Sequence, residues 1–192
     1  PLITNLWPMC ELNIWDLGLD TLPTKEFNPS TDKNAIQTAT LGNKDLKIEF
    51  SGLGGQVSKV ELLQYKAYDH KTDNVDLPLY LIDKNNSNYG FAFKDKAGKT
   101  VNTQNLVFTP TVSGNTVTMT TNYNGAIIQF VYTLLDKYTL DFKVRTQGLS
   151  KIATSKKADF KWDFNVRRIE KGRSQEQSHS EFSYAFNNYK DY

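Results

Sequence analysis

Cysteine and histidine, the residues that most often carry metal or nucleophilic chemistry, are almost missing from this 192-residue chain. Cys10 is its single cysteine, which excludes an internal disulfide bond. His70 and His179 are its two histidines, and neither has a cysteine or histidine neighbour at the spacing of zinc ligands. We therefore expect no metal site and no cofactor. We interpret both histidines as solvated surface residues and Cys10 as a free thiol.

An excess of charge of one sign is also missing. The net charge is +2, from 23 basic and 21 acidic residues, and no stripe of Lys and Arg interleaved with aromatics is present, so we expect no nucleic-acid partner. No apolar run approaches the ~20 residues of a membrane-spanning helix. Residues 1–20 lack the basic start of a secretory signal. If the natural protein is exported or anchored, we expect the responsible segment to lie outside these residues.

Catalytic motifs are absent as well, including the glycine-rich dinucleotide and phosphate loops. Carboxylates need more care, because glycosidases and epimerases use an acid and a base that project into a cleft. Asp159 and Asp163 fall on one face of a predicted strand, and Glu176 and Glu181 flank His179. The two aspartates lie on the polar side of that strand, where solvated charges are expected. We therefore predict no catalytic residue and no enzyme activity.

What the chain does contain is a strong β pattern, and its first clear unit is a strand, a tight turn and a second strand. Leu46, Ile48 and Phe50 alternate with polar residues, which is typical of a strand with one buried face. Gly54 and Gly55 follow and predict a structural turn, because glycine adopts positive φ without steric clash. The alternation then slips in the segment 57–60, which indicates a β-bulge.

The pattern continues to the end of the chain. A charged loop is expected at 69–76 and a short strand at 79–82, and Asn124-Gly125 is a favoured pair for a type I′ hairpin turn. Residues 138–145 and 160–167 alternate almost without error, so each segment predicts a strand with one buried and one wet face. We expect a loop with some helical turn at 170–181 and a last strand from Phe182 to Phe186. The fold class is all-β, an antiparallel sandwich of about ten strands with no long helix.

Residues 1–37 differ in composition from the rest. They hold four of the six prolines and two of the three tryptophans. We interpret them as an N-terminal extension or linker with one short helix between Cys10 and Leu19. Residues 38–192 then form the domain.

Tyrosines offer one further candidate surface. Tyr65, Tyr68, Tyr80 and Tyr89 could line a platform that binds a sugar or a peptide, although all four are equally good strand residues. We favour the second interpretation.

A resemblance to a known family rests on an ordered set of segments. They are Leu46-x-Ile48-x-Phe50-Ser51-x-x-Gly54-Gly55-x-Val57-x-x-Val60-x-Leu62-x-x-Tyr65-Lys66, Asn88-Tyr89-Gly90-Phe91, Tyr132-Thr133-Leu134, Tyr138-x-Leu140-Asp141-Phe142, and Glu170-Lys171-Gly172-Arg173 with Glu176. This order resembles the large periplasmic domain of the YidC membrane protein insertases, in the form found in Bacteroidetes-type bacteria. The resemblance covers roughly residues 38–190.

The resemblance implies a β-supersandwich similar to that of galactose mutarotases, on the periplasmic side of the bacterial inner membrane. It implies a non-enzymatic interaction or chaperone surface, with the Sec translocon, its accessory subunits and nascent membrane proteins as partners. It implies no cofactor and carries over no catalytic residue. The isolated domain is expected to be a monomer, and the chain is expected to stop before the family's closing strand and amphipathic helix.

Two other functions remain open at this point. One is a secreted carbohydrate-binding or aldose-epimerase-like sandwich, which the aromatic residues and the carboxylates near His179 favour. The other is a purely structural module of the cell envelope. The residues that would bind a partner cannot be named from the sequence.

Overall fold

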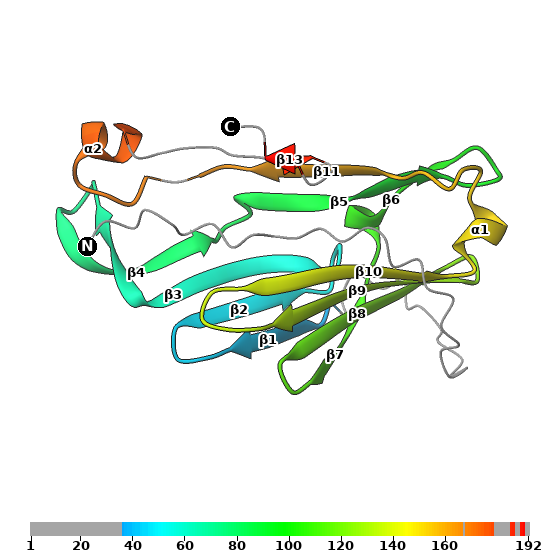
Figure 1. Cartoon of the computed structure of the whole chain (residues 1–192), viewed down its shortest axis with the longest axis horizontal. Coiled ribbons are helices and arrows are strands. Elements are labelled where there is room, and N and C mark those ends of the chain that lie inside the picture. The colour runs from blue at the N-terminus through cyan, green and yellow to red at the C-terminus, as the bar shows by residue number, and fades with distance from the viewer. Residues whose placement is uncertain (1–35, 167, 179–184, 187–188, 191–192) are drawn as a thin grey trace.

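Antiparallel β-strands account for most of the structure, a computed structural model that describes residues 36–166, 168–178, 185–186 and 189–190 (Figure 1). The strands are β1 (Thr38–Gly42), β2 (Leu46–Ser51), β3 (Gln56–Asp69), β4 (Asn74–Ile82), β5 (Ser87–Lys94), β6 (Thr100–Asn102), β7 (Thr109–Ser113), β8 (Thr116–Tyr123), β9 (Ala126–Leu134), β10 (Leu140–Gln147), β11 (Asp159–Phe164), β12 (Ala185–Phe186) and β13 (Tyr189–Lys190). The helices are short: η2 (Thr103–Asn105), α1 (Leu149–Ile152) and α2 (Arg173–Ser178). Within the described ranges, no helix is long and apolar enough to cross a membrane.

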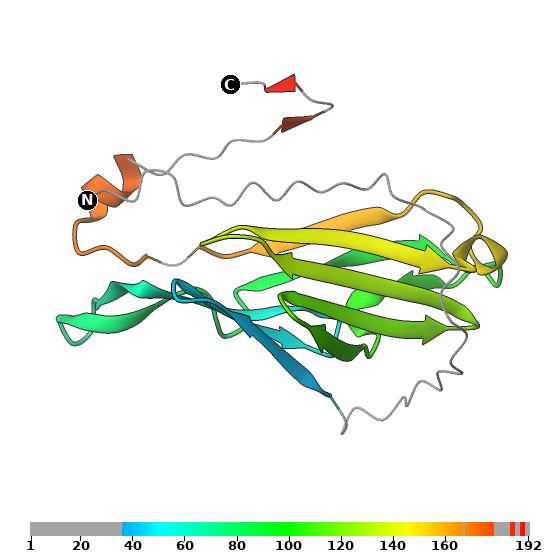
Figure 2. The same ribbon diagram turned by 60° about the horizontal axis from the view of Figure 1, so that its bottom comes forward.

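Three sheets form a sandwich-like body, which confirms the expected all-β class. Their strand orders are β1-β2-β3-β4, β10-β9-β8-β7 and β11-β5-β6, and a separate pair joins β12 to β13. In Figure 2 the second sheet, green to yellow, packs across the first, blue to cyan. Aromatic rings fill the space between the sheets: the Phe50 ring lies 4.9 Å from that of Tyr132, and the Tyr89 ring lies 6.0 Å from that of Phe142. Burial of such side chains is the main driving force for the fold.

The hairpin predicted at the start of the β pattern is confirmed. β2 and β3 pair in antiparallel register, with Glu49 opposite Lys59 and Phe50 opposite Val57. Ser58 is therefore an extra residue in β3, so the bulge expected in the segment 57–60 is present. The bulge lets both Val57 and the later apolar residues of β3 face the core.

A second irregularity in β3 changes the predicted loop. Leu62 pairs with Leu79 but Lys66 pairs with Pro78, so three residues of β3 bulge out together. Beyond them β3 and β4 continue as a polar hairpin arm, and only residues 70–73 form its turn. The expected loop at 69–76 was thus too long and the expected strand at 79–82 too short. Both faces of the arm reach solvent, so polar side chains are tolerated on either face. The strands can therefore stay paired although their sequence lacks apolar alternation.

The Asn124-Gly125 turn joins β8 to β9 as predicted. Asn124 has φ 50° and Gly125 has φ 83°, the two positive values that a type I′ turn requires. The Asn122 side chain accepts a hydrogen bond from the Gly125 amide at 3.0 Å, which supports the turn.

The prediction for residues 160–167 was wrong in one respect. β11 forms as expected, but Trp162 is 45% exposed and Val166, beyond the end of the strand, is 72% exposed. β11 is an edge strand that pairs with β5 at one side of the molecule (Figure 1), and its residues Phe160 and Phe164 are half-buried while Trp162 stays exposed. Alternation reports which residues share a face, and not whether another layer covers that face.

At the C-terminal end, α2 supplies the helical turn expected at 170–181. Phe186 belongs to β12, while Phe182 and Tyr184 lie outside the described residues, as does the helix expected between Cys10 and Leu19. Thirteen strands are described instead of about ten, because several are only two or three residues long.

Candidate functional site

The glycine turn between β2 and β3 is buried within the molecule. Gly54 has φ 75° and Gly55 has φ 63°, and both residues are buried. A Cβ atom on Gly55 would lie 2.8 Å from Cγ of Phe108, and one on Gly54 would lie 2.9 Å from the side-chain nitrogen of Gln56 and 3.3 Å from the backbone of Gln104. Both the backbone conformation and the packing therefore require glycine. These residues shape the turn and expose no group to a ligand.

A chain of buried hydroxyls connects this turn to two other strands. The Val57 amide donates to the Tyr89 hydroxyl at 2.9 Å, the hydroxyls of Tyr89 and Tyr132 lie 2.8 Å apart, and the Tyr132 hydroxyl donates to the Gly55 carbonyl at 2.8 Å. Since the carbonyl can only accept, Tyr132 uses its single proton there and Tyr89 must be the donor between the two tyrosines. This series of hydrogen bonds links the turn to Tyr89 of β5 and Tyr132 of β9.

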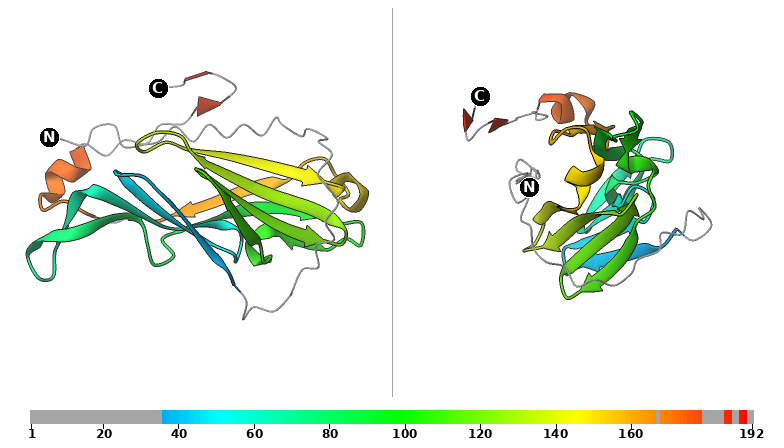
Figure 3. Two further views of the ribbon diagram at one scale, coloured as in Figure 1. Left: turned by 90° about the horizontal axis from the view of Figure 1, so that it is seen from below. Right: turned by 90° about the vertical axis from the view of Figure 1, so that its right-hand side faces the viewer.

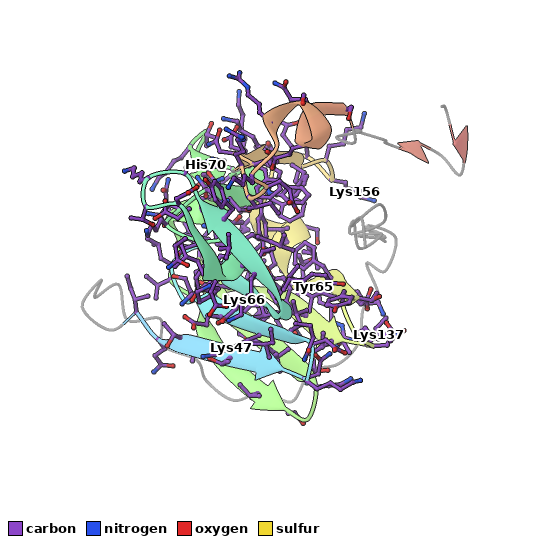
Figure 4. The ribbon with its side chains drawn as sticks, turned by 90° about the vertical axis from the view of Figure 1, so that its left-hand side faces the viewer. Lys47, Tyr65, Lys66, His70, Lys137 and Lys156 are labelled. Carbon is purple, nitrogen blue, oxygen red and sulfur yellow. The ribbon has the colours of Figure 1, made fainter. Side chains whose placement is uncertain are left out.

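The four tyrosines proposed as a binding platform do not form one. Tyr89 is buried within the core, which removes it from any surface. Tyr65 packs instead toward Tyr138, with ring centroids 6.2 Å apart, and the Tyr80 ring lies under the Lys59 ammonium at 4.6 Å. Figure 4 shows Tyr65 well away from His70, which stacks edge-on against Tyr68 at 4.7 Å. These tyrosines serve as strand residues.

The candidate carboxylates have structural partners. Asp163 forms an ion pair with Lys161 at 2.9 Å on the exposed side of β11. Glu176 accepts a hydrogen bond from the Ile169 amide at 2.9 Å and lies 3.3 Å from Nε of Arg168. Glu176 thereby holds the connection that leads from β11 to α2.

His179, Glu181 and Cys10 lie outside the described residues, so the constellation around His179 is not seen. Asp159 and His70 are exposed. Across the described part of the chain, no three His, Cys, Asp or Glu side chains gather closely enough to hold a metal ion.

The connection between β11 and α2 also contacts the arm made by β3 and β4. Nothing in the sequence indicated this contact. The Tyr68 amide donates to the Ile169 carbonyl at 3.0 Å, and Lys171 lies 3.7 Å from an Asp73 carboxylate oxygen. The Tyr68 hydroxyl donates to the same carboxylate. This hydrogen bond raises the pKa of Tyr68 and, with the Lys171 charge, lowers the pKa of Asp73.

Trp162 on β11 is the aromatic residue among the exposed large hydrophobic residues of the described structure. Its indole nitrogen donates to the Ser87 hydroxyl at 3.0 Å, and its ring stacks on Phe164 with centroids 5.8 Å apart. The side chain is thus held in one orientation while nearly half of it reaches solvent. A fixed, exposed tryptophan is typical of a residue that anchors an interface.

The backbone of β11 also faces outward at this residue. The Asn165 amide donates to the Asn86 carbonyl at 2.7 Å, which places Asp163 and Lys161 at the residues that bond to β5. In an antiparallel ladder the residues between them turn their N–H and C=O groups the other way. The Tyr89 amide, opposite Trp162, accordingly donates to the Gln56 side chain instead of β11, at 2.9 Å. Trp162 therefore combines an exposed ring with outward-facing backbone groups.

Comparison with known proteins identifies the family. The family model of the YidC periplasmic domain matches residues 38–192. The chain is 34% identical over 153 residues to the membrane protein insertase YidC of Phocaeicola vulgatus, covering 77% of this chain and 24% of that protein. It is 34% identical over 154 residues to YidC of Parabacteroides distasonis, with coverages of 77% and 23%. For YidC of Porphyromonas gingivalis the identity is 28% over 157 residues, with coverages of 79% and 24%.

The matched region begins where the β pattern begins, and it includes every segment on which the resemblance was based. No solved structure matches the chain significantly. The chain spans about a quarter of the length of the curated relatives it matches. The match extends over most of the chain, and the chain therefore belongs to the YidC periplasmic domain family.

Proposed function

We propose that this chain is the periplasmic domain of an inner-membrane protein insertase and acts there as a non-enzymatic interaction surface. The family match over residues 38–192 is the observation that carries this proposal. The partners are accessory subunits of the Sec translocon or segments of membrane proteins that emerge during insertion. The isolated domain is monomeric and works without a cofactor.

The edge strand β11 is the surface that we assign to this contact. Edge strands present unpaired backbone groups to which an extended segment can add as a further strand. Trp162 supplies an aromatic anchor beside those groups, and its hydrogen bond to Ser87 fixes the anchor before binding. Lys161 and Asp163, on either side of Trp162 in the sequence, already pair with each other, so a contact there would leave neither charge without its partner.

The carbohydrate-active alternative finds little support among the described residues. Glu176 is engaged in holding the β11–α2 connection, and Tyr89 is buried. Neither is available to line a sugar-binding surface.

Photocrosslinking in the full-length insertase tests the assignment. A photoreactive phenylalanine analogue placed at Trp162 should crosslink to a translocon subunit or to a nascent membrane protein. The matched control is the same analogue at Val112, which is 52% exposed on β7, an edge strand of another sheet. Crosslinks at Trp162 and not at Val112 support the proposal. Equal products at both positions, or none at Trp162, would overturn it.

A further inference from the structure

One end of the molecule brings together three segments that are distant in sequence. The turn between β5 and β6, the helix α1, and the segment that leads into β11 meet there, as Figure 1 and the right panel of Figure 3 show. The Lys96 amide donates to the Ile152 carbonyl at 2.8 Å, and the Thr154 amide donates to the Lys94 carbonyl at 2.9 Å. These backbone hydrogen bonds fix the segments 94–99 and 149–159 against each other. We call this region the α1 end.

The α1 end carries a cluster of exposed lysines without ion-pair partners. They are Lys94, Lys96, Lys99, Lys151, Lys156 and Lys157. Within the described ranges none of them lies within ion-pairing distance of a carboxylate. Seven lysines elsewhere do have an acidic partner: Lys44, Lys47, Lys59, Lys66, Lys143, Lys161 and Lys171. Among the described residues outside this end, Lys71, Lys84 and Lys137 also have no ion-pair partner, so the α1 end is distinguished by the gathering of six such lysines.

The two acidic residues of these segments do little to offset the lysines. Asp95 is buried and accepts hydrogen bonds from the amides of Lys99 at 2.9 Å and Ala97 at 3.0 Å, and from the Tyr123 hydroxyl at 3.0 Å. Asp159 is exposed. Six lysines against two aspartates leave a formal net charge of +4, which exceeds the +2 of the whole chain. Residues 36–192 together carry a formal net charge of +5, so the α1 end holds most of the excess positive charge of the domain.

Exposed apolar anchors are missing from the α1 end. The exposed large hydrophobic residues of the described structure all lie elsewhere: Ile36, Leu53, Leu63, Val75, Val112, Leu135, Trp162 and Val166. Stable protein–protein contacts are centred on desolvated aromatic or aliphatic anchors. A cluster of lysines alone suits a diffuse anionic surface, to which each exposed cation adds an increment of attraction.

We propose that the α1 end binds the anionic phospholipid headgroups of a bilayer surface. This inference rests on the proposed function, which places the domain beside a membrane. Binding there would orient the domain and hold it close to the surface, with β11 extending away from the basic end. The lysine stems are long and flexible, so they can adjust to headgroups that have no fixed positions.

Sedimentation of the full chain with lipid vesicles tests the proposal. The chain should bind vesicles that contain about 30% phosphatidylglycerol and should not bind vesicles of phosphatidylcholine alone. Raising the salt from about 0.05 M to 0.5 M should release it, because exposed charges are screened at a Debye length of a few ångströms.

Paired variants locate the binding surface. The variant Lys94→Gln, Lys96→Gln, Lys156→Gln and Lys157→Gln should lower vesicle binding at least about tenfold. The control is Lys44→Gln, Lys47→Gln, Lys66→Gln and Lys137→Gln, which removes the same charge. Figure 4 shows Lys156 well away from Lys47, Lys66 and Lys137. The control should bind nearly as well as the unaltered chain.

Three results would overturn the proposal. They are no binding to the anionic vesicles, equal losses in the two variants, and binding to a poly-glutamate peptide without binding to vesicles. The last result would identify an acidic polypeptide as the ligand. None of them bears on the crosslinks expected at Trp162 in the intact insertase, so a failure here is distinguishable from a failure of the proposed function.

Discussion

At the scale of single residues, Gly55 shows two separate reasons for glycine at one position. Its φ of 63° lies in the left-handed region, and a Cβ would lie 2.8 Å from the Phe108 ring. Gly114 has a similar φ of 56° in the β7–β8 turn, yet no atom lies within 4 Å of its hypothetical Cβ. A side chain at Gly114 would meet backbone strain alone, whereas one at Gly55 would meet both backbone strain and steric overlap.

This comparison makes a prediction for stability. Gly55→Ala should lower the free energy of unfolding by about 2–4 kcal/mol, from backbone strain and overpacking together. Gly114→Ala should lower it by about 1 kcal/mol, from strain alone. Urea denaturation followed by tryptophan fluorescence measures both. Equal losses in the two variants would contradict the steric part of the explanation.

At the scale of elements, the buried hydroxyl chain links the turn before β3 to β5 and β9. Each of the two tyrosine hydroxyls both donates and accepts a hydrogen bond. Removal of either hydroxyl therefore takes a hydrogen bond away from each of its two neighbours in this network. Tyr89 lies in the three-stranded sheet and Tyr132 in the four-stranded sheet of β7 to β10. The hydroxyls thus couple two sheets that exchange no strand hydrogen bonds with each other.

A double-mutant cycle measures this coupling. Tyr89→Phe and Tyr132→Phe should each lower the free energy of unfolding by about 1–2 kcal/mol. The double variant should lose less than the sum, by about 0.5–1.5 kcal/mol, because the two share one hydrogen bond. Tyr80→Phe on β4 is the control and should change stability by less than about 0.5 kcal/mol. Strict additivity in the cycle would show that the two hydroxyls act independently.

At the scale of the whole molecule, the described core is confined to the domain predicted from residue 38 onward. Its buried hydrophobic residues extend from Ala39 to Ala153, and they contact one another as one cluster. A single cluster of this size is typical of one cooperative folding unit. The boundary near residue 38 remains a prediction, and deletion of the preceding segment tests it.

Removal of residues 1–35 should leave a chain that unfolds in one cooperative transition. We expect its Tm to differ from that of the full chain by less than about 3 °C, which corresponds to about 1 kcal/mol for a chain of this size. Differential scanning calorimetry provides the measurement. A Tm lower by about 10 °C or more would mean that the first 35 residues belong to the folding unit.

The sequence by itself determined the local features of this protein. The β2–β3 hairpin, the bulge at Ser58 and the Asn124-Gly125 turn were all predicted, because each depends on backbone preferences within a few residues. The ordered segments also sufficed to indicate the family.

Only the tertiary structure decided which faces are covered and which distant residues meet. It buried Tyr89, left Trp162 exposed on an edge strand, and docked Tyr68 against Ile169. It also gathered six lysines from segments 94–99 and 149–159 into one end, in a chain whose total charge is almost balanced. The reason is physical: burial and charge density depend on the neighbours that long-range packing supplies, and periodicity along one segment carries no information about them.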